Sequence, residues 1–446
     1  MTGSTVRRYA LALLVALAIL RFGLVFTAGL RFNRGDFYAT LPGAHAQAVN
    51  PTLWNSPDLE DIQGKQAAYL RGPTQYVTLY PLVYLDSYAT IAAVLLVGYG
   101  IVILLIAEVS YRFLRPLTDG ALTRAPLLIA TLLYFPLLQG WLGREFELVI
   151  TLAVAGAYWA TVHDKRGTLG ALLAYVSLYK YLPFLSVPYL LVRRWWSSVT
   201  AFLATTAVLL VAAQWLVGLE GFVKNHIPGM AMGLVTTLTS TKAFCDGPVK
   251  LLRFFESGQE VSVRTALCSS SQWSGIPPAT AYLALVGIVL SASIYGTWRL
   301  ERAAELPAAT ERWRRVWELS LVVVVSTTFF YGHYYYLGVL ILPLNALMVR
   351  FSNRPTRSWP RLSLWGLAYL LLAAFLLPPT YVSRAIGIDV WKLYFTYNVY
   401  FPGELILLGL ILHQYATLPV GPPTTDRAWA PNAASRRPAP GYGGRP

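Results

Sequence analysis

The sequence has few charged residues for its length. Only 13% of its 446 residues are Asp, Glu, Lys or Arg, whereas a soluble domain contains about 25%. So few charges cannot cover a soluble globule of this size, which excludes that class. Hydrophobic residues make up 56% of the chain, and its 14 Trp and 28 Tyr suit the aromatic belts found at membrane interfaces. The composition therefore indicates a polytopic membrane protein.

The sequence also lacks the motifs that hold metals and nucleotides. It has no HExxH or CxxC motif, no DxD in its first long polar segment, and only five His. No P-loop is present, and no GxGxxG stands at a strand-to-helix turn. The formal charge is +15, but the basic residues form small scattered clusters instead of one basic face. We therefore expect no metal, no other cofactor and no nucleic-acid partner.

Cysteine is nearly absent as well. The chain has two, Cys245 and Cys268, and both fall in one long segment at about 220–279. If this segment lies outside the cell, it is in an oxidising compartment where a disulfide persists. We predict a Cys245–Cys268 disulfide, and the alternative is two free thiols.

Long apolar runs predict an all-α bundle of about twelve membrane-spanning helices. A span needs about 20 mostly apolar residues. Three stretches (125–162, 168–192 and 316–349) are each predicted to be a broken pair of shorter helices. Their breaks fall at Gly140–Glu147, Lys180–Pro183 and Tyr331–His333. Irregular backbone of this kind lines cavities in transporters and membrane enzymes. The uninterrupted runs lie at about 9–30, 88–111, 199–219, 280–298, 362–379 and 400–417.

The loop charges predict the orientation. On the side of the termini the loops hold 22 Lys and Arg against 6 Asp and Glu, and on the other side 12 against 12. The positive-inside rule then places both termini in the cytoplasm and two large loops, about 31–87 and 220–279, outside the plasma membrane. A signal peptide is the alternative for the first run, but that run is long and no cleavage site follows closely. The transmembrane domain is expected at 1–417, with a disordered tail at 418–446.

The first outer loop offers a candidate general base. Asp36 follows the first span closely, so a helix end would hold its carboxylate near the membrane surface. A carboxylate there could take a proton from a sugar hydroxyl. The alternative for Asp36 is a helix cap or a solvated loop acid. The same loop contains four competing carboxylates: Asp58, Glu60, Asp61 and Asp86.

Other ionisable residues lie within or beside the predicted spans. Such groups are costly in a membrane and are functional candidates by default. Lys180 and His333 could bind a lipid-linked phosphate, and the alternatives are a snorkelling lysine and a core histidine. Arg144, with two neighbouring glutamates, forms either an ion-pair cluster or a site, and His226 is a site residue or a solvated loop histidine. Arg21 lies in the middle of the first span and receives no role.

These features follow one another along the chain in an order that resembles that of GT-C superfamily glycosyltransferases. The chain is most similar to glycosyltransferase family 87, which includes polyprenyl-phosphate-mannose-dependent mannosyltransferases. The features that carry the resemblance are Asp36 after the first span, Leu79-Tyr80-Pro81-Leu82, the Lys180 to Pro183 break, and Gly332-His333-Tyr334-Tyr335 before an apolar helix.

The resemblance implies a GT-C-like fold and an inverting transfer of mannose or another envelope sugar. The donor would be a polyprenyl-phosphate sugar and the acceptor a glycolipid or glycan on the extracytoplasmic face, with membrane lipids around the protein. Asp36 would be the catalytic base, and Lys180 and His333 would lie near the donor phosphate. Four further residues are expected to bind substrate: Tyr80, Arg144, His226 and Tyr334.

Two other functions stay open at this point. An envelope glycan polymerase or ligase is also polytopic, but we expect it to depend on outer-loop Arg and His instead of a carboxylate after the first span. A lipid-linked-sugar transporter often shows two matching halves, and the sequence has no internal repeat.

Overall fold

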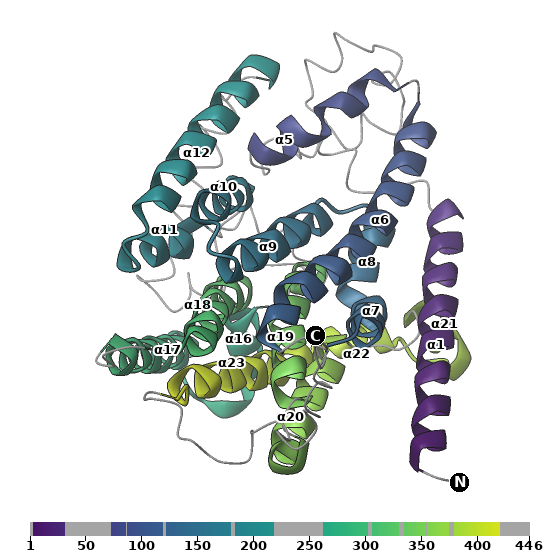
Figure 1. Ribbon diagram of the computed structural model, residues 1–446. Helices are drawn as coiled ribbons and strands as arrows, with labels where there is room; N and C mark the ends of the chain where they lie inside the picture. Colours follow the sequence, from purple (N-terminus) through teal and green to yellow (C-terminus); the bar gives the residue numbers. More distant parts are fainter. Residues whose placement is uncertain are drawn as a thin grey trace, which may run out of the picture.

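The protein is helical throughout the part of the chain that the structure describes. The computed structural model describes residues 3–31, 73–85, 87–118, 122–179, 183–217, 262–301, 306–329, 334–352, 355–373 and 379–419. No strand occurs in these ranges (Figure 1), which confirms the all-α part of the predicted fold class for them, while the GT-C-like arrangement stays a prediction. Most of both predicted outer loops, and the predicted tail from 420 on, lie outside the described residues.

Several helices are long and apolar enough to cross a membrane. Four single helices pass this test: α1 (Gly3–Arg31), α6 (Tyr88–Leu114), α12 (Trp196–Val217) and α17 (Pro278–Glu301). Two bent pairs raise the number to six: α7 (Arg124–Leu133) with α8 (Phe135–Gly143), and α22 (Val390–Thr396) with α23 (Tyr400–Ala416). Among the described residues the test thus gives four to six spans, and the count of twelve stays a prediction.

The other helices of the bundle are shorter or more polar, and several of them end beside the predicted breaks. They are α9 (Glu147–Val162), α10 (Arg166–Ser177), α11 (Pro183–Val192), α18 (Ala308–Thr328), α19 (Ile341–Ser352) and α20 (Pro355–Ala373), with the 3-10 helices η4 (Arg115–Leu117) and η7 (Tyr334–Leu340). Helix ends flank all three predicted interruptions: α8 stops before α9, α10 before α11, and α18 before η7. The predicted break before Glu147 is therefore confirmed, whereas residues 180–182 and 330–333 lie outside the described residues and the breaks there stay predictions.

One further break was not predicted. The axes of α7 and α8 meet at 58°, and Tyr134 between them has extended backbone (φ −81, ψ 102). Pro136 follows two residues later, in the first turn of α8. Its ring cannot donate a backbone hydrogen bond and would clash with the carbonyl four residues before it, so one continuous helix cannot form here.

Helix α9 occupies the centre of the bundle. It packs against α6, α10, α18 and η7. Most of its residues are buried, including Ala153, Ala155, Ala157 and Ala160. Small side chains let neighbouring helices approach closely where lipid supplies no hydrophobic drive for association.

The contact between α10 and α12 is closer still. A Cβ atom added at Gly170 of α10 would lie 2.0 Å from the carbonyl oxygen of Ser198 in α12. Any larger residue there would force the helices apart. Ser198 also donates its hydroxyl to the carbonyl of Arg166, at 2.8 Å, so both ends of this contact are fixed.

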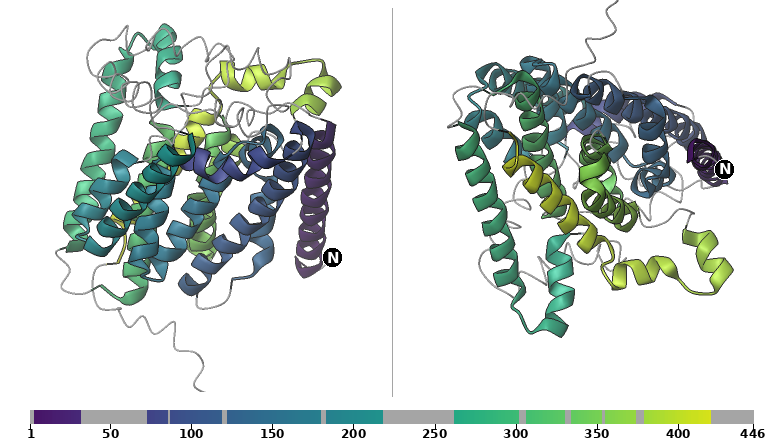
Figure 2. Two further views of the ribbon diagram at one scale, coloured as in Figure 1. Left: turned by 90° about the horizontal axis from the view of Figure 1, so that it is seen from above. Right: turned by 60° about the horizontal axis from the view of Figure 1, so that its bottom comes forward.

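Short helices occupy parts of the chain that were expected to be loops. They are α5 (Pro73–Leu79), the 3-10 helix η3 (Tyr80–Tyr84), α16 (Val263–Ser274) and α21 (Pro379–Ile386). Figure 2 (left) shows α16, α21 and α22 at the end of the bundle opposite the N-terminal end of α1. Buried apolar residues such as Val263 and Ala266 explain why α16 packs instead of remaining a solvated loop.

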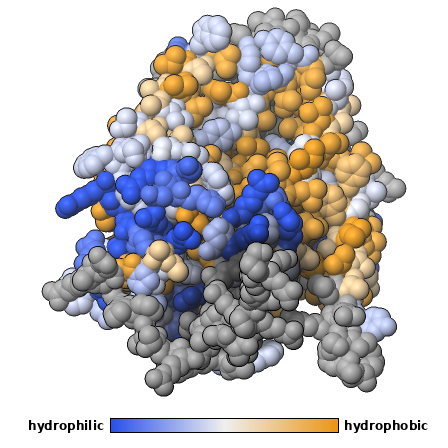
Figure 3. Space-filling view, viewed as in Figure 1, coloured by the Kyte–Doolittle hydropathy of each residue, from blue (hydrophilic) through white to orange (hydrophobic). Residues whose placement is uncertain are grey.

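Large apolar side chains cover the outside of the long helices. Leu13 on α1, Val211 and Trp215 on α12, and Ile294 on α17 are all exposed. Exposed apolar area of this kind suits contact with lipid tails. On the face shown in Figure 3, hydrophilic residues gather in one area beside a broad apolar surface.

Candidate active site

The structure describes three of the predicted substrate-binding residues. These are Tyr80, Arg144 and Tyr334. The predicted base Asp36 and the predicted binding residues Lys180, His226 and His333 lie outside the described residues, so their roles stay predictions. What the structure does show is how the helix ends nearest to them in the chain are held.

Arg144 joins the end of α1 to the start of α6. It follows α8 with left-handed backbone (φ 54, ψ 43), which turns its buried side chain back into the bundle. Its Nη2 atom donates to the carbonyl of Gly29 at 2.8 Å, and its Nε atom donates to the carbonyl of Ala92 at 3.1 Å. The guanidinium therefore holds the last turn of α1, after which the chain continues to Asp36.

A buried tyrosine and glutamate hold the end of α10. The hydroxyl of Tyr179 donates to Oε1 of Glu147 at 2.5 Å, and its ring lies 5.1 Å from that of Phe146. Tyr179 is the residue directly before Lys180. The sequence places Glu147 in a charged cluster beside Arg144. It does not indicate a role for Tyr179, because Tyr179 and Glu147 are 32 residues apart in the chain.

The predicted segment Leu79-Tyr80-Pro81-Leu82 is joined to α10 by the helix that leads into it, α5. The Thr74 hydroxyl donates to the carbonyl of Tyr175 at 2.8 Å, and the Thr78 hydroxyl lies 2.7 Å from the Tyr175 hydroxyl. Tyr80, the first residue of η3, is 8% exposed and packs edge-on against Tyr84 with 6.0 Å between ring centroids. These contacts place Tyr80 on the side of the bundle formed by α10 and α12.

Tyr334 stands at the centre of an aromatic cluster. Its ring lies within 6.0 Å of the rings of Phe135, Trp391, Tyr394 and Phe395. Its hydroxyl donates to the carbonyl of Leu372 at 2.9 Å, near the end of α20. Since Tyr334 directly follows His333 in the chain, this cluster fixes the backbone next to that residue. The aromatic partners on α22 come from a segment to which the sequence analysis assigns no function.

Arg21 lies beside this cluster and is fully buried. Its Nη1 atom donates to the carbonyl of Leu133 at 2.8 Å, and its Cζ atom lies 5.3 Å from the ring centroid of Phe135. Leu133 is the last residue of α7, and a helix end leaves carbonyls without partners inside the helix. Arg21 thus ties α1 to the break between α7 and α8, a role that its position in the sequence did not reveal.

Contacts connect these groups into one framework. Helix η7, which begins at Tyr334, packs against α8 and α9, and α8 leads directly to Arg144. Glu147 then links α9 to α10 through Tyr179, and α5 joins α10 to the segment of Tyr80. Arg144 and Tyr334 thus lie on packed elements, whereas Tyr80 connects to them through α10. The framework holds the helix ends that precede Asp36 and Lys180, together with the 3-10 helix that follows His333.

Two other expectations concern cysteine and metal. Cys268, on α16, is disulfide-bonded, while Cys245 lies outside the described residues, so the Cys245–Cys268 pairing stays a prediction. In the described parts of the chain, no three His, Cys, Asp or Glu side chains gather in a way that could hold a metal ion.

Comparison with known proteins identifies one family. A family model of glycosyltransferase family 87 matches residues 69–327, which is more than half of the chain. The matched segment contains Tyr80, Arg144, Lys180 and His226, whereas Asp36, His333 and Tyr334 lie outside it. No curated protein and no solved structure matches the chain.

Proposed function

The chain belongs to glycosyltransferase family 87, and from this membership we propose a specific reaction for this membrane glycosyltransferase. It transfers mannose or another envelope sugar from a polyprenyl-phosphate donor to a glycolipid or glycan acceptor. The reaction takes place on the extracytoplasmic face of the plasma membrane and inverts the anomeric carbon. The family match over residues 69–327 is the observation that carries the proposal.

The proposed chemistry is a direct displacement. An acceptor hydroxyl oxygen attacks the anomeric carbon, the bond from that carbon to the phosphate oxygen breaks, and polyprenyl phosphate leaves with the electron pair. The hydroxyl proton passes to the carboxylate of Asp36 as the new bond forms. A single displacement from the face opposite the leaving group inverts the configuration.

The structure shows how the helix that precedes Asp36 in the chain is held. That residue follows the end of α1, Arg31, by five residues. Arg144 binds the carbonyl of Gly29 in the last turn of the helix, and Arg21 anchors its middle. The proposal is that this fixed helix end keeps the Asp36 carboxylate within reach of the hydroxyl proton, which is what orientation contributes to catalysis.

Lys180 and His333 are proposed to bind the donor phosphate. Each is next in sequence to a buried tyrosine whose hydroxyl is hydrogen-bonded: Tyr179 to Glu147 at 2.5 Å, and Tyr334 to the carbonyl of Leu372 at 2.9 Å. Anchored neighbours reduce the entropy lost when a side chain is ordered around a ligand.

The other predicted binding residues divide into two groups. The Arg144 guanidinium and the Tyr334 hydroxyl are engaged with backbone carbonyls. We therefore assign these two a positioning role. Tyr80 and His226 remain proposed substrate contacts at the outer end.

The test is transfer by the purified, full-length protein in lipid nanodiscs. Radiolabelled polyprenyl-phosphate mannose, arabinose and glucose are each offered with glycolipid acceptors, and labelled product is separated by chromatography. We expect product from a lipid-linked donor and none from the matching nucleotide sugar. Product from the nucleotide sugar alone would exclude the proposed donor. Movement of the lipid-linked sugar across the bilayer without any transfer would indicate a transporter.

A further inference from the structure

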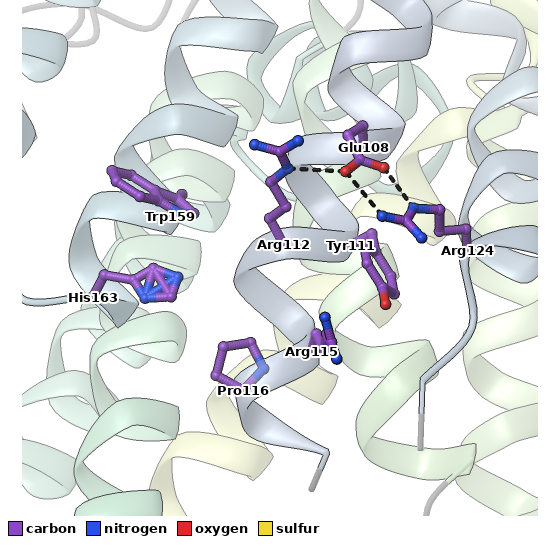
Figure 4. A pocket seen from close by; sticks show the side chains of 8 residues that line it. All are labelled: Glu108, Tyr111, Arg112, Arg115, Pro116, Arg124, Trp159 and His163. Atoms are coloured by element: carbon purple, nitrogen blue, oxygen red, sulfur yellow. Dashed lines mark hydrogen bonds and ion pairs between the residues drawn. The ribbon is translucent and has the colours of Figure 1, made fainter. Parts of the chain in front are cut away.

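A pocket of about 590 Å³ opens at the end of the bundle opposite the candidate active site. It is lined by the last turns of α6 and α9 and by the start of α7. Figure 4 shows Trp159 of α9 and His163, the residue directly after α9, on one side, Arg124 of α7 on the other, and residues of α6 between them. Because Arg144 joins the end of α1 to the start of α6, these helices are antiparallel. The pocket therefore lies at the end where α1 begins, away from the candidate active site.

The pocket is basic, and the carboxylate of Glu108 holds two of its arginines in place. Glu108 accepts a hydrogen bond from Nε of Arg112 and another from Nε of Arg124, each at 2.9 Å. The Cζ atom of Arg124 also lies 4.4 Å from the ring centroid of Tyr111. Arg115 also lines the pocket, so its lining holds three guanidinium groups and one carboxylate, which gives it a net positive charge.

Donor groups remain for an anion. In the described structure the terminal nitrogens of Arg112 make no hydrogen bond. The guanidinium of Arg115 makes none to a described residue either, and its Cζ atom lies 6.0 Å from the ring centroid of Tyr111. Both side chains are exposed. Guanidinium groups recognise phosphate through paired N–H donors, so this arrangement has the chemistry of a phosphate site.

An exposed apolar surface continues from the pocket along the same helices. On α6, Val97, Ile101 and Leu104 are exposed at helical spacing and lead to Glu108 on the same face. On α7, Leu128 is exposed one turn after Arg124. Helices α6 and α7 pack side by side. A ligand with a charged head in the pocket would thus have an apolar surface beside it for its tails.

We propose that this pocket binds the phosphate headgroup of an anionic phospholipid from the leaflet at that end of the bundle. The guanidinium groups of Arg112 and Arg115 bind the phosphate, and the acyl chains lie along the exposed apolar residues of α6 and α7. Basic pockets between membrane helices are suited to anionic headgroups. The apolar surface on α6 and α7 favours a lipid over a free anion.

The experiment measures lipid binding by native mass spectrometry on the delipidated, full-length protein in detergent. The probes are phosphatidylglycerol, phosphatidylcholine of equal chain length, and inorganic phosphate as a competitor. We expect phosphatidylglycerol to bind at least tenfold more tightly than phosphatidylcholine. Losing charged hydrogen bonds should weaken phosphatidylglycerol binding by about ten- to a hundredfold in Arg112→Gln/Arg115→Gln.

Two matched variants make the result specific. Arg115→Gln alone removes a side chain that bonds to no described residue, so it should fold normally and still weaken binding. Arg361→Gln removes another exposed arginine, on α20 and outside the pocket, and should bind like the wild type. Equal loss in Arg361→Gln, or wild-type affinity in the double variant, would overturn the proposal. Displacement of the lipid by equimolar inorganic phosphate would overturn the lipid assignment.

Discussion

At the scale of single residues, long polar side chains donate hydrogen bonds to backbone carbonyls near the breaks between helices. Arg21 donates to the carbonyl of Leu133, Tyr134 to that of Leu337, and Tyr369 to that of Ala130. Each break leaves backbone carbonyls without helical partners, and the membrane interior offers no water to satisfy them. Arg, Tyr and Trp reach far enough to bridge from another helix, which explains why so many of these residues are buried here.

We expect Asp36→Asn to abolish turnover. Asparagine keeps the size of the side chain but cannot accept the proton of the acceptor hydroxyl. The variant should fold, bind donor and lose turnover by about 10² or more, measured as initial rates in the nanodisc assay. Asp58→Asn, Asp61→Asn and Asp86→Asn are the matched controls. An active Asp36→Asn beside one inactive control would move the base to that position.

Lys180→Ala and His333→Ala should weaken donor binding. Each removes a charged or polar partner of the phosphate, which costs about 1.5–3 kcal/mol, so apparent affinity should fall by roughly ten- to a hundredfold. Affinity is measured by titrating the lipid-linked donor into each purified variant. Lys165→Ala, an exposed lysine between α9 and α10, should bind like the wild type. Unchanged affinity in both site variants would place the phosphate elsewhere.

At the scale of the elements, close helix packing decides which substitutions are tolerated. Helix α10 contains two glycines in different surroundings. A Cβ at Gly170 would lie 2.0 Å from the Ser198 carbonyl oxygen, whereas a Cβ at Gly167 would meet nothing within 4 Å. The two positions therefore separate the packing effect from the helix propensity of alanine.

Gly170→Ala should destabilise the protein by about 1–3 kcal/mol, because α10 and α12 must move apart. Gly167→Ala should be neutral or stabilise it by up to about 1 kcal/mol, since alanine favours the helix. Thermal unfolding in detergent, followed by tryptophan fluorescence, compares the two. Equal melting temperatures for both variants would contradict the close contact.

The second outer segment should be closed by the Cys245–Cys268 disulfide. A non-reducing peptide map of protein purified without reductant should show the two peptides linked. Alkylation of both thiols in the same preparation would reject the pairing. Because the bridge lies outside the predicted spans, a double Cys→Ser variant should still insert in the membrane, with faster proteolysis between 220 and 279.

At the scale of the whole molecule, orientation decides which end of the bundle performs the chemistry. The candidate active site and the basic pocket lie at opposite ends. The charge difference between the loops predicts that the pocket faces the cytoplasm and the site faces outward. Both proposals therefore depend on topology, which labelling can establish independently of activity.

Single cysteines at Gly64 and Gly258 should react with a membrane-impermeant maleimide added to intact cells. Gly167→Cys, at an exposed position in the first turn of α10, should react only after the membrane is opened. The experiment keeps the native cysteines, and reaction of the parent protein gives the background. Labelling of either loop position only from the cytoplasmic side would reverse the orientation.

Local composition was enough to predict the membrane class, the all-helical character of the described residues and the helix break before Glu147. Each depends on residues near one another in the chain: an apolar run forms a helix, and a segment such as Gly143-Arg144-Glu145 interrupts one. The long helices α1, α6, α12 and α17 accordingly match the predicted runs. The same reasoning overlooked the bend before α8, although Pro136 is a local signal for it.

The tertiary structure alone decided which polar side chains meet. Arg144 binds the carbonyl of Gly29 across 115 positions, and Arg21 binds that of Leu133 across 112. The carboxylate of Glu108 forms an ion pair with Arg124 of the next helix, α7. Such partners depend on how the helices cross and turn about their axes, and helices in lipid are positioned by packing of their small residues. A periodic pattern specifies which face of a helix is buried, but not which carbonyl lies opposite it.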